Sequence, residues 1–286
     1  MFGRRFADLL ATKFMVVMVA LVVSIVLFVG IGLFLKSLPI LGSHPLNELL
    51  FTTSWKPSKG EFGFLPFIMG TVWVTALAGA IAVPISLLTA LYLAEYAPER
   101  VRATVKPMVD LLAGIPPVVY GVWGILALSA GGISIGFNVL AGGIVLAIMV
   151  IPVVTAIAEE VFRTVPKDVK EASLCVGATQ WETAKHVVIR SSLAGVAAAI
   201  ILGFSRAFGE TMAVLMVVGN IARIPSSIFD AAYPLPALIA NNYGEVMSVP
   251  LYDSALLFAA LLLFVVILLF NVIARLVLLR VQRGVA

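Results

Sequence analysis

Charged residues are scarce in this chain of 286 residues, and the scarcity decides its class. Only 12% of the residues are charged, 62% are hydrophobic, and the mean hydropathy is +1.12. A soluble domain carries about 25% charged residues. Nineteen basic and fifteen acidic side chains cannot cover the surface of a soluble protein of 30.4 kDa. The composition therefore excludes a soluble enzyme, a nucleic-acid-binding domain and a disordered tail, and it predicts a polytopic membrane protein.

Residues that build metal and nucleotide sites are also lacking. Cys175 is the only cysteine, which excludes a disulfide within the chain and a cysteine-built metal site. His44 and His186 lie far apart in the sequence and form no ligand cluster. No G-x-x-x-x-G-K-[S/T] string occurs, so the chain has no P-loop with which to bind ATP. We expect no metal and no cofactor in this chain, and if its activity is driven by ATP, another chain must bind the nucleotide.

Long apolar runs are abundant, and they predict the fold class. A helix needs about 20 mostly apolar residues to cross a bilayer. Six runs qualify, at residues 14–35, 67–94, 108–129, 138–158, 193–218 and 255–279. The first is too long for a signal peptide and no cleavage site follows it, so we interpret it as a retained anchor. We predict an all-α polytopic protein of the cell membrane with six transmembrane helices.

Lysine and arginine are distributed unequally between the predicted loops. Fourteen lie on the side that contains both termini, and four lie on the other side. Cytoplasmic loops carry the excess of basic residues, so both termini are predicted to be cytoplasmic. Residues 1–63 would form an N-terminal cytoplasmic segment, an anchor helix and the first external loop. Residues 64–286 would form a core of five helices with a long cytoplasmic loop at 162–192.

The third predicted span contains helix-breaking residues. Pro116 and Pro117 are adjacent, and Gly121 follows them. Proline removes a backbone hydrogen bond and kinks a helix. One interpretation is a broken helix that lines a pathway and helps it to open and close. The alternative is that proline and glycine are simply commoner in membrane helices, which we favour for Pro84 and Pro152.

The loop at 162–192 has the signals of two short helices. Pro166 suits the first turn of a helix, and Gly177 suits its C-terminal cap. Thr179 and Glu182 then have the spacing of a capping box. The first helix would include Lys170, Glu171 and Ala172. We predict a stiff pair of helices, with an amphipathic loop at the membrane interface as the alternative.

The fifth predicted span contains two charged residues. Arg206 and Glu210 are four residues apart, so one continuous helix would place them on one face. That face would share the arc of a ridge of small residues, which lets another helix approach; the ridge consists of Gly195, Ala199, Gly203 and Ala207. A charge at the bilayer centre costs about 2.5–3.5 kcal/mol. The pair is therefore expected to face protein or a water-filled path.

The chemistry of this pair suits an anion. The planar guanidinium of Arg206 can donate two parallel hydrogen bonds to a tetrahedral oxyanion. Glu210 would neutralise Arg206 when no substrate is bound and could accept a hydrogen bond from a singly protonated oxyanion. The alternative is a buried structural ion pair that fixes helix register.

The loop at 162–192 contains the string Glu171-Ala172-Ser173-Leu174-Cys175-Val176-Gly177, with Val187 and Ile189 downstream. This pattern resembles the EAA loop of ABC importer permeases. Ser173 replaces the second alanine, and Arg190 stands where proline is usual. The resemblance implies that the first helix of the loop docks on an ATPase subunit. It assigns this coupling role to Pro166, Lys170, Glu171, Ala172 and Gly177.

Two further strings carry a more specific resemblance. The fifth span reads Ser205-Arg206-Ala207-Phe208-Gly209-Glu210-Thr211-Met212-Ala213-Val214, and residues 112–124 read L-A-G-I-P-P-V-V-Y-G-V-W-G. They are similar to R-A-x-G-E-T-M-A-V and L-A-x-I-P-x-V-V-Y-G-x-W-G of PstC-type phosphate permeases, with Pro117 where serine is usual. The likeness extends from about Thr52 to Leu279. It implies a MetI-like permease fold and a phosphate pathway containing Arg206, Glu210 and Thr211.

The resemblance also implies partners. They are a PstA-like permease subunit, two cytoplasmic ATPase subunits and an external phosphate-binding protein. Asp110 aligns with an acidic residue of the family, and we interpret it as a structural charge near a helix N-terminus. A permease for molybdate or sulfate is the nearest alternative. An ion-coupled secondary transporter would show inverted repeats, and a membrane enzyme would show clustered His, Asp or Glu; the sequence shows neither.

Overall fold

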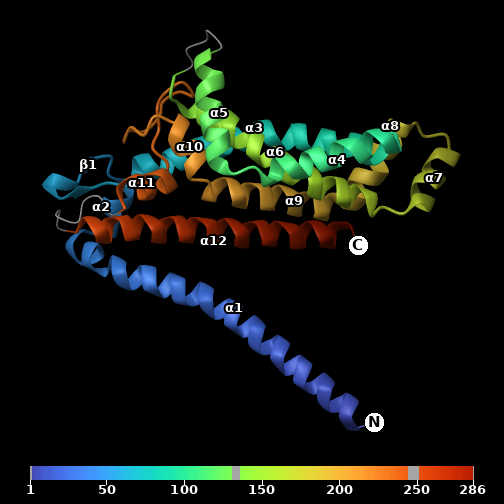
Figure 1. The fold of residues 1–286 in the computed structure, drawn as a ribbon, viewed down its shortest axis with the longest axis horizontal. Coiled ribbons are helices and arrows are strands. Elements are labelled where there is room, and N and C mark those ends of the chain that lie inside the picture. The colour runs from blue at the N-terminus through green and yellow to red at the C-terminus, as the bar shows by residue number, and fades with distance from the viewer. Residues whose placement is uncertain (1, 131–135, 244–250, 286) are drawn as a thin grey trace.

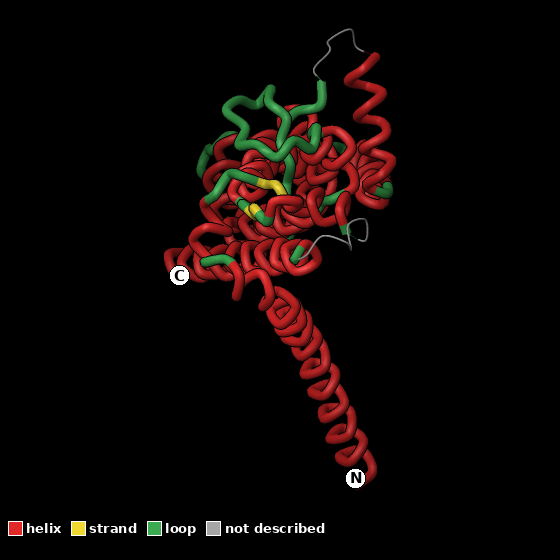
Figure 2. The backbone as a smooth tube through the Cα atoms, turned by 90° about the vertical axis from the view of Figure 1, so that its left-hand side faces the viewer, coloured by secondary structure: helices red, strands yellow, loops and turns green. Residues whose placement is uncertain are grey.

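The computed structural model describes residues 2–130, 136–243 and 251–285, and these residues are almost wholly helical (Figures 1 and 2). The elements are α1 (Phe2–Ser43), α2 (Leu46–Phe51), β1 (Trp55–Lys56), the 3₁₀ turn η1 (Pro57–Lys59), β2 (Glu61–Phe62), α3 (Leu65–Glu95), α4 (Glu99–Gly114), α5 (Pro117–Ala130), α6 (Val139–Arg163), α7 (Lys167–Cys175), α8 (Gln180–Thr183), the π-helical turn η2 (Ala184–Val188), α9 (Ile189–Gly209), α10 (Met212–Val217), α11 (Leu235–Asn242) and α12 (Tyr252–Val285). The predicted all-helical class is confirmed.

Helices α3, α6, α9 and α12 run along the long axis of the molecule (Figure 1). The most extensive contact joins α3 to α6. Small residues make this contact close: a Cβ atom added at Gly143 of α6 would lie 2.7 Å from Cδ2 of Leu77 in α3. The buried side chains of α3, α6 and α9 form the main hydrophobic core, with Ala78, Val154 and Ala199 fully buried.

Five of the described helices are long and apolar enough to cross a membrane: Asp8–Ser43, Leu65–Glu95, Val139–Arg163, Gln180–Gly209 and Tyr252–Leu276. A sixth span exists only if α4 and α5 together count as one. The membrane class is therefore confirmed, while the number of six spans stays a prediction.

The third predicted span is not one straight helix. The chain bends by 96° between α4 and α5, and the break falls at Ile115 and Pro116, with Pro117 as the first residue of α5. The predicted break at the two prolines is confirmed. Gly121 is a correction, because it lies inside the continuous helix α5 and packs against α10. Figure 1 shows α5 leaving the direction of the other helices.

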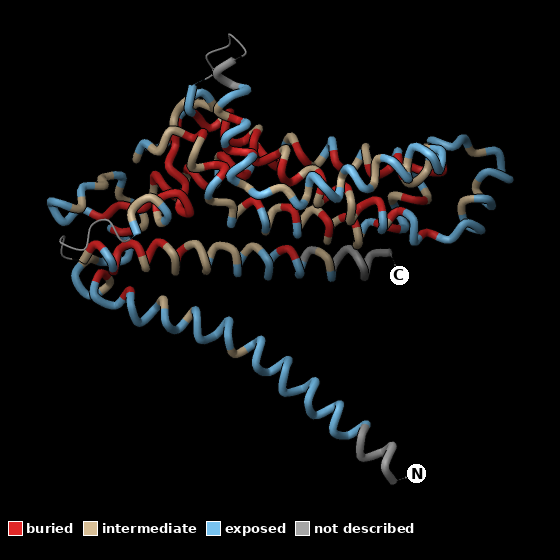
Figure 3. Tube along the Cα trace, viewed as in Figure 1, coloured by how far each residue is buried: buried red, intermediate tan, exposed pale blue. Residues whose placement is uncertain are grey.

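Helix α1 is exposed along most of its length and leaves the bundle at an angle (Figures 2 and 3). Only its C-terminal part packs, against α12. There Ile40 N donates to Ser254 Oγ at 3.1 Å, and Ser254 Oγ donates to the carbonyl of Lys36 at 3.1 Å. Helix α1 continues to Ser43, beyond the predicted end of the span at Leu35. The prediction marked the end of the apolar segment, and a helix can extend past that point.

The two ends of the bundle differ. The free ends of α1 and α12 lie toward the end that carries α7 and α8, and β1, α2 and α11 lie at the opposite end (Figure 1). The short hairpin pairs Trp55 with Phe62 in antiparallel register. Trp55 also stacks edge-on with Phe64 and Phe67, which fixes the hairpin on the bundle. This arrangement agrees with termini and long loop on one side of the membrane.

Candidate functional site

Arg206 and Glu210 lie at a break in the fifth predicted span. Helix α9 ends at Gly209, and Glu210 has an extended backbone with φ −73° and ψ 123°. The predicted continuous helix at 193–218 is therefore wrong, because α9 ends one residue before Glu210. The Glu210 carboxylate accepts a hydrogen bond from Ala213 N at 3.4 Å. This hydrogen bond stabilises the first turn of α10.

The expected ion pair is a second correction. Among the described residues, no hydrogen bond or ion pair joins Arg206 to Glu210 or to any other side chain. The side chain of Arg206 is exposed. Glu210 does not neutralise Arg206 in this conformation. The guanidinium keeps its hydrogen-bond donors available.

The ridge of small residues on α9 is present and packs against α6. Ala199, Gly203 and Ala207 are buried, and a Cβ atom at Gly203 would lie 3.2 Å from Cγ1 of Val150. Arg206 itself is exposed, so the contact between α9 and α6 does not cover its side chain.

Glu210 and Thr211 have local partners at the break. Thr211 Oγ1 donates to the carbonyl of Gly209 at 3.3 Å. Glu210 lines a small cavity together with Thr71 and Thr75 of α3. The cavity has room for about one water molecule, because a water needs roughly 10–15 Å³. A cavity of this size cannot hold an ion as large as phosphate.

The two breaks of the bundle lie against each other. Helix α5 follows the break at Pro116, α10 follows the break at Glu210, and the two helices pack together. A Cβ atom at Gly121 of α5 would lie 3.2 Å from the Cα of Ala213 in α10. Gly121 therefore permits a close approach rather than a bend.

Tyr120 is a residue that sequence reasoning missed. Its hydroxyl donates to the carbonyl of Leu112 at 2.8 Å, across the break between α5 and α4. In an unbroken helix this carbonyl would accept from residue 116, but Pro116 has no N–H. The signal was available in the sequence: a proline four residues after Leu112 and a hydroxyl-bearing aromatic residue four residues further on.

The loop at 162–192 contains the predicted glycine turn and capping box. Helix α7 begins after Pro166, which is its N-cap residue rather than part of its first turn. Gly177 has φ +91°, a left-handed conformation that favours glycine. Thr179 and Glu182 form a capping box, and the hydrogen bond from Thr179 N lowers the pKa of the Glu182 carboxyl. The predicted first helix is confirmed, whereas the second is not a separate short helix, because it continues into α9.

The predicted coupling residues differ in their surroundings. Glu171 and Ala172 are exposed on α7, whereas Lys170 is directed at the bundle. Lys170 Nζ contacts Glu95 Oε1 at 2.6 Å, with both side chains largely buried. Gln180 Nε2 donates to the carbonyl of Glu95 at 2.9 Å. The end of α3 thus fixes both helices of the loop, and Glu95 had no local signal in the sequence.

Arg190, the departure from the family pattern, leaves the helix intact. The segment Gln180–Gly209 runs as one helix through the π-helical turn Ala184–Val188. The loop therefore joins α9 without a break in the helix.

Helix breaks inside a multi-pass helical bundle are typical of membrane transport proteins. The chain belongs to the family of binding-protein-dependent transport system inner membrane components, whose family model matches residues 82–283. It is an ABC transporter permease subunit of the membrane.

Several relatives are similar over most of the chain. The phosphate transport system permease protein PstC of Xylella fastidiosa (strain 9a5c) is 36% identical over 260 residues, covering 82% of this chain and 80% of that protein. PstC of Mesorhizobium japonicum is 36% identical over 277 residues, covering 88% and 84%. The probable ABC transporter permease protein YqgH of Bacillus subtilis is 35% identical, covering 87% and 84%.

Solved structures show the same fold. The inward-facing MetNI methionine ABC transporter matches with a TM-score of 0.60 at 20% identity, covering 74% of this chain and 93% of that chain. A crystal structure of an amino acid ABC transporter with histidines matches with a TM-score of 0.54 at 18% identity, covering 76% and 93%. The expected MetI-like permease fold is confirmed.

Proposed function

We propose that this chain is the permease subunit of an ATP-driven importer that moves inorganic phosphate into the cytoplasm. The observation that carries the proposal is Arg206: an exposed guanidinium, without an ion pair among the described residues, at a helix break inside an apolar segment. A cation in such a place is costly, and a function for it is the default hypothesis. The likeness to PstC phosphate permeases suggests that the transported anion is phosphate.

The residues at the break have separate roles in this proposal. Arg206 binds two phosphate oxygens through its planar fork, which lysine matches only as a point charge. Glu210 leaves Ala213 N when the break opens and accepts the hydrogen bond of a singly protonated phosphate. Thr211 Oγ1 is the neighbouring donor. Because the adjoining cavity holds about one water, phosphate passes only after the break opens.

The loop at 162–192 couples this opening to ATP hydrolysis on partner chains. Its surface presents exposed apolar residues that suit a docking groove; they are Val169, Leu174, Val176 and Trp181. The complex would contain two ATPase subunits that hold ATP and Mg²⁺, a PstA-like permease subunit and an external phosphate-binding protein. Six spans with both termini in the cytoplasm complete the proposed topology, which the shared end of α1, α7 and α12 supports.

Uptake of labelled phosphate by vesicles containing the complete complex tests the assignment. Arg206→Ala is expected to lower the uptake rate at least tenfold, because a bidentate charged contact of about 1.5–3 kcal/mol is lost. Arg206→Lys is expected to recover only part of the rate. Arg275→Ala removes another exposed arginine of a membrane helix and serves as the control. Parent-like phosphate uptake by both Arg206 variants would remove Arg206 from the pathway.

The same vesicles separate the alternatives. Phosphate uptake that needs ATP inside the cytoplasmic compartment and ignores ion gradients supports the importer, and uptake driven by an ion gradient alone contradicts it. Sulfate and molybdate are offered in parallel with phosphate. Preferred uptake of either would retain the permease class and replace the substrate.

A further inference from the structure

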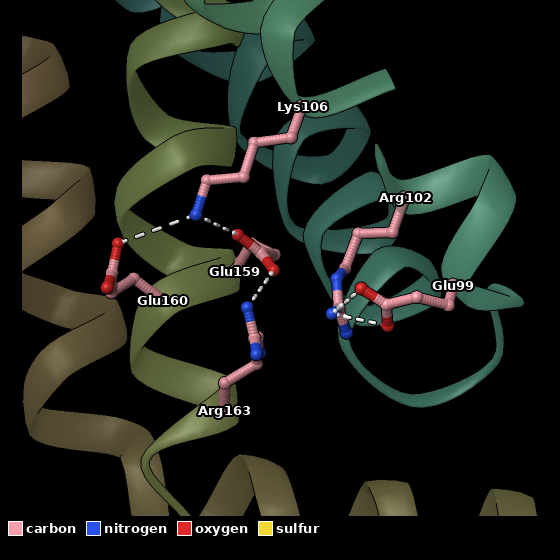
Figure 4. A network of polar contacts seen from close by, with 6 residues as sticks. All are labelled: Glu99, Arg102, Lys106, Glu159, Glu160 and Arg163. Carbon is pink, nitrogen blue, oxygen red and sulfur yellow. Dashed lines mark hydrogen bonds and ion pairs between the residues drawn. The ribbon is translucent and has the colours of Figure 1, made fainter. Parts of the chain in front are cut away.

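A buried carboxylate lies at the α7 end of α6, away from Arg206. Glu159 is 2% exposed, and its oxygens face two cations: Lys106 Nζ of α4 at 3.4 Å and Arg163 Nη1 of α6 at 3.5 Å (Figure 4). Lys106 also approaches the exposed carboxylate of Glu160 at 3.8 Å. The proposed pathway and the coupling contacts use none of these four residues.

The two cations do not serve Glu159 equally. Arg163 lies one turn away on the same helix, so it neutralises Glu159 without joining two elements. Lys106 is the cross-helix partner. Among the described residues, Glu159 Oε1 has no hydrogen-bond donor. The ion pairs therefore offset most of the desolvation cost of burying this charge. Separation of Lys106 from Glu159 is therefore costly but leaves a second cation in place.

Helix α4 depends on this contact. No residue of α4, which is described in full, is buried, although the helix lies along α6. Elements with few buried apolar contacts have the lowest local stability and are the ones that move. The Lys106–Glu159 pair is thus a specific fastening on a helix that packing alone holds weakly.

The fastening joins the two functional parts of the chain. On one side, α4 continues through the 96° break into α5, which packs on α10 beside the break at Glu210. On the other side, α6 ends at Arg163 and a short connection leads to α7. Phe162 and Val165, which flank the end of α6, are buried. A displacement of the loop would reach Glu159 through these packed residues.

We propose that the Lys106–Glu159 ion pair is a releasable latch between α4 and α6 that opens in each transport cycle. The closed latch holds α4 and its break in the conformation seen here. Movement of α7 displaces the end of α6, releases Lys106 and lets α4 and α5 shift away from α10. The inference rests on the ATP-driven transport role proposed above, but it does not depend on which anion is carried.

Charge variants of the complete complex give the first test. Glu159→Gln keeps the shape and removes the attraction for Lys106, so α4 is released without a signal from the loop. We expect the phosphate imported per ATP hydrolysed to fall at least threefold. Glu160→Gln is the matched control, because Glu160 contacts the same lysine but is 76% exposed at its side chain, where ion pairs contribute little. The charge exchange Lys106→Glu with Glu159→Lys should recover part of the lost ratio.

A reversible cross-link gives the decisive test. Lys106→Cys and Glu159→Cys are combined in a Cys175→Ala background and joined with a short bis-methanethiosulfonate reagent. We expect ATP hydrolysis by the complete complex with its binding protein to fall at least tenfold and to recover after reduction. Glu99→Cys with Arg102→Cys places the same cross-link within α4 alone and should leave hydrolysis unchanged (Figure 4).

The outcomes separate this proposal from the previous one. ATP hydrolysis that continues in the cross-linked complex would show that the cycle does not require the two residues to separate, and the latch would be overturned. An unchanged import ratio in Glu159→Gln would do the same. A complex that hydrolyses ATP but does not import phosphate would contradict the substrate, while its arrest by the cross-link would still support the latch.

Discussion

Gly177 shows how one backbone conformation shapes the loop at 162–192. Its φ of +91° turns the chain between α7 and α8, and no atom lies within 4 Å of the position that a Cβ would take. A side chain at this position therefore meets no steric obstacle from its neighbours. The cost of a substitution is the cost of the left-handed backbone alone, about 1–2 kcal/mol for an ordinary residue.

Because only the backbone conformation limits which residue fits at position 177, substitutions there test the turn directly. Gly177→Val is expected to distort the turn, because β-branched residues tolerate positive φ poorly, and to lower ATP-driven uptake several-fold. Gly177→Asn should retain most of the uptake, since asparagine adopts this conformation more readily. Uptake and co-purification of the ATPase subunits measure the effect at normal protein levels. Equal activity of the two variants would argue against a role for the turn.

Residue-scale chemistry was predictable only in part. The types and spacing of Arg206, Glu210 and Thr211 indicated an anion site in an apolar segment, and the structure places all three at one break. Their mutual geometry was not predictable, because the apolar run continues to Val218 and gave no sign that α9 ends at Gly209. A single glycine interrupts a helix only when the surroundings support the alternative. Here the Glu210 carboxylate does so by accepting from Ala213 N.

At the scale of elements, Tyr120 stabilises the break between α4 and α5. Tyr120→Phe removes the donor to the Leu112 carbonyl and leaves only Ile115 N, at 3.3 Å, on that oxygen. We expect a loss of about 1–2 kcal/mol in stability and a lower maximal uptake rate, with a smaller change in KM. Thermal unfolding of the purified complex and uptake at varied phosphate measure both effects.

The control for this prediction is Tyr92→Phe. Tyr92 is an exposed tyrosine of α3, and among the described residues no hydrogen bond of its hydroxyl is found. Both its stability and its uptake should match the parent. An unchanged Tyr120→Phe protein would mean that the prolines alone hold the bend.

Local signals explain which elements were predictable. Hydropathy located the long helices, and the capping box with Gly177 located α7 and α8. The contacts between them were not predictable. Lys170 meets Glu95, and Lys106 meets Glu159, across separations that no periodic pattern connects. Both pairs depend on how α3, α4 and α6 pack, which is set by the whole core rather than by either partner's neighbours.

At the scale of the whole molecule, the two ends of the bundle must face different compartments. The end with α7 and α8 also holds the free ends of α1 and α12, and the hairpin β1–β2 lies at the opposite end (Figure 1). Basic residues favour the cytoplasmic side, and fourteen of them fall in segments assigned to the first end. From this distribution of basic residues we expect α7 and α8 to face the cytoplasm.

The single cysteine of the chain tests this orientation without any added probe. Cys175 is exposed at the end of α7, so a membrane-impermeant maleimide should label it in inverted vesicles and not in intact cells. Removal of the ATPase subunits should increase labelling, because the docking surface would be uncovered. Ser58→Cys in a Cys175→Ala background, on the exposed turn between β1 and β2, should show the opposite pattern. Labelling of Cys175 in intact cells would reverse the topology and, because an external α7 cannot meet a cytoplasmic ATPase, would also remove the coupling role of the loop.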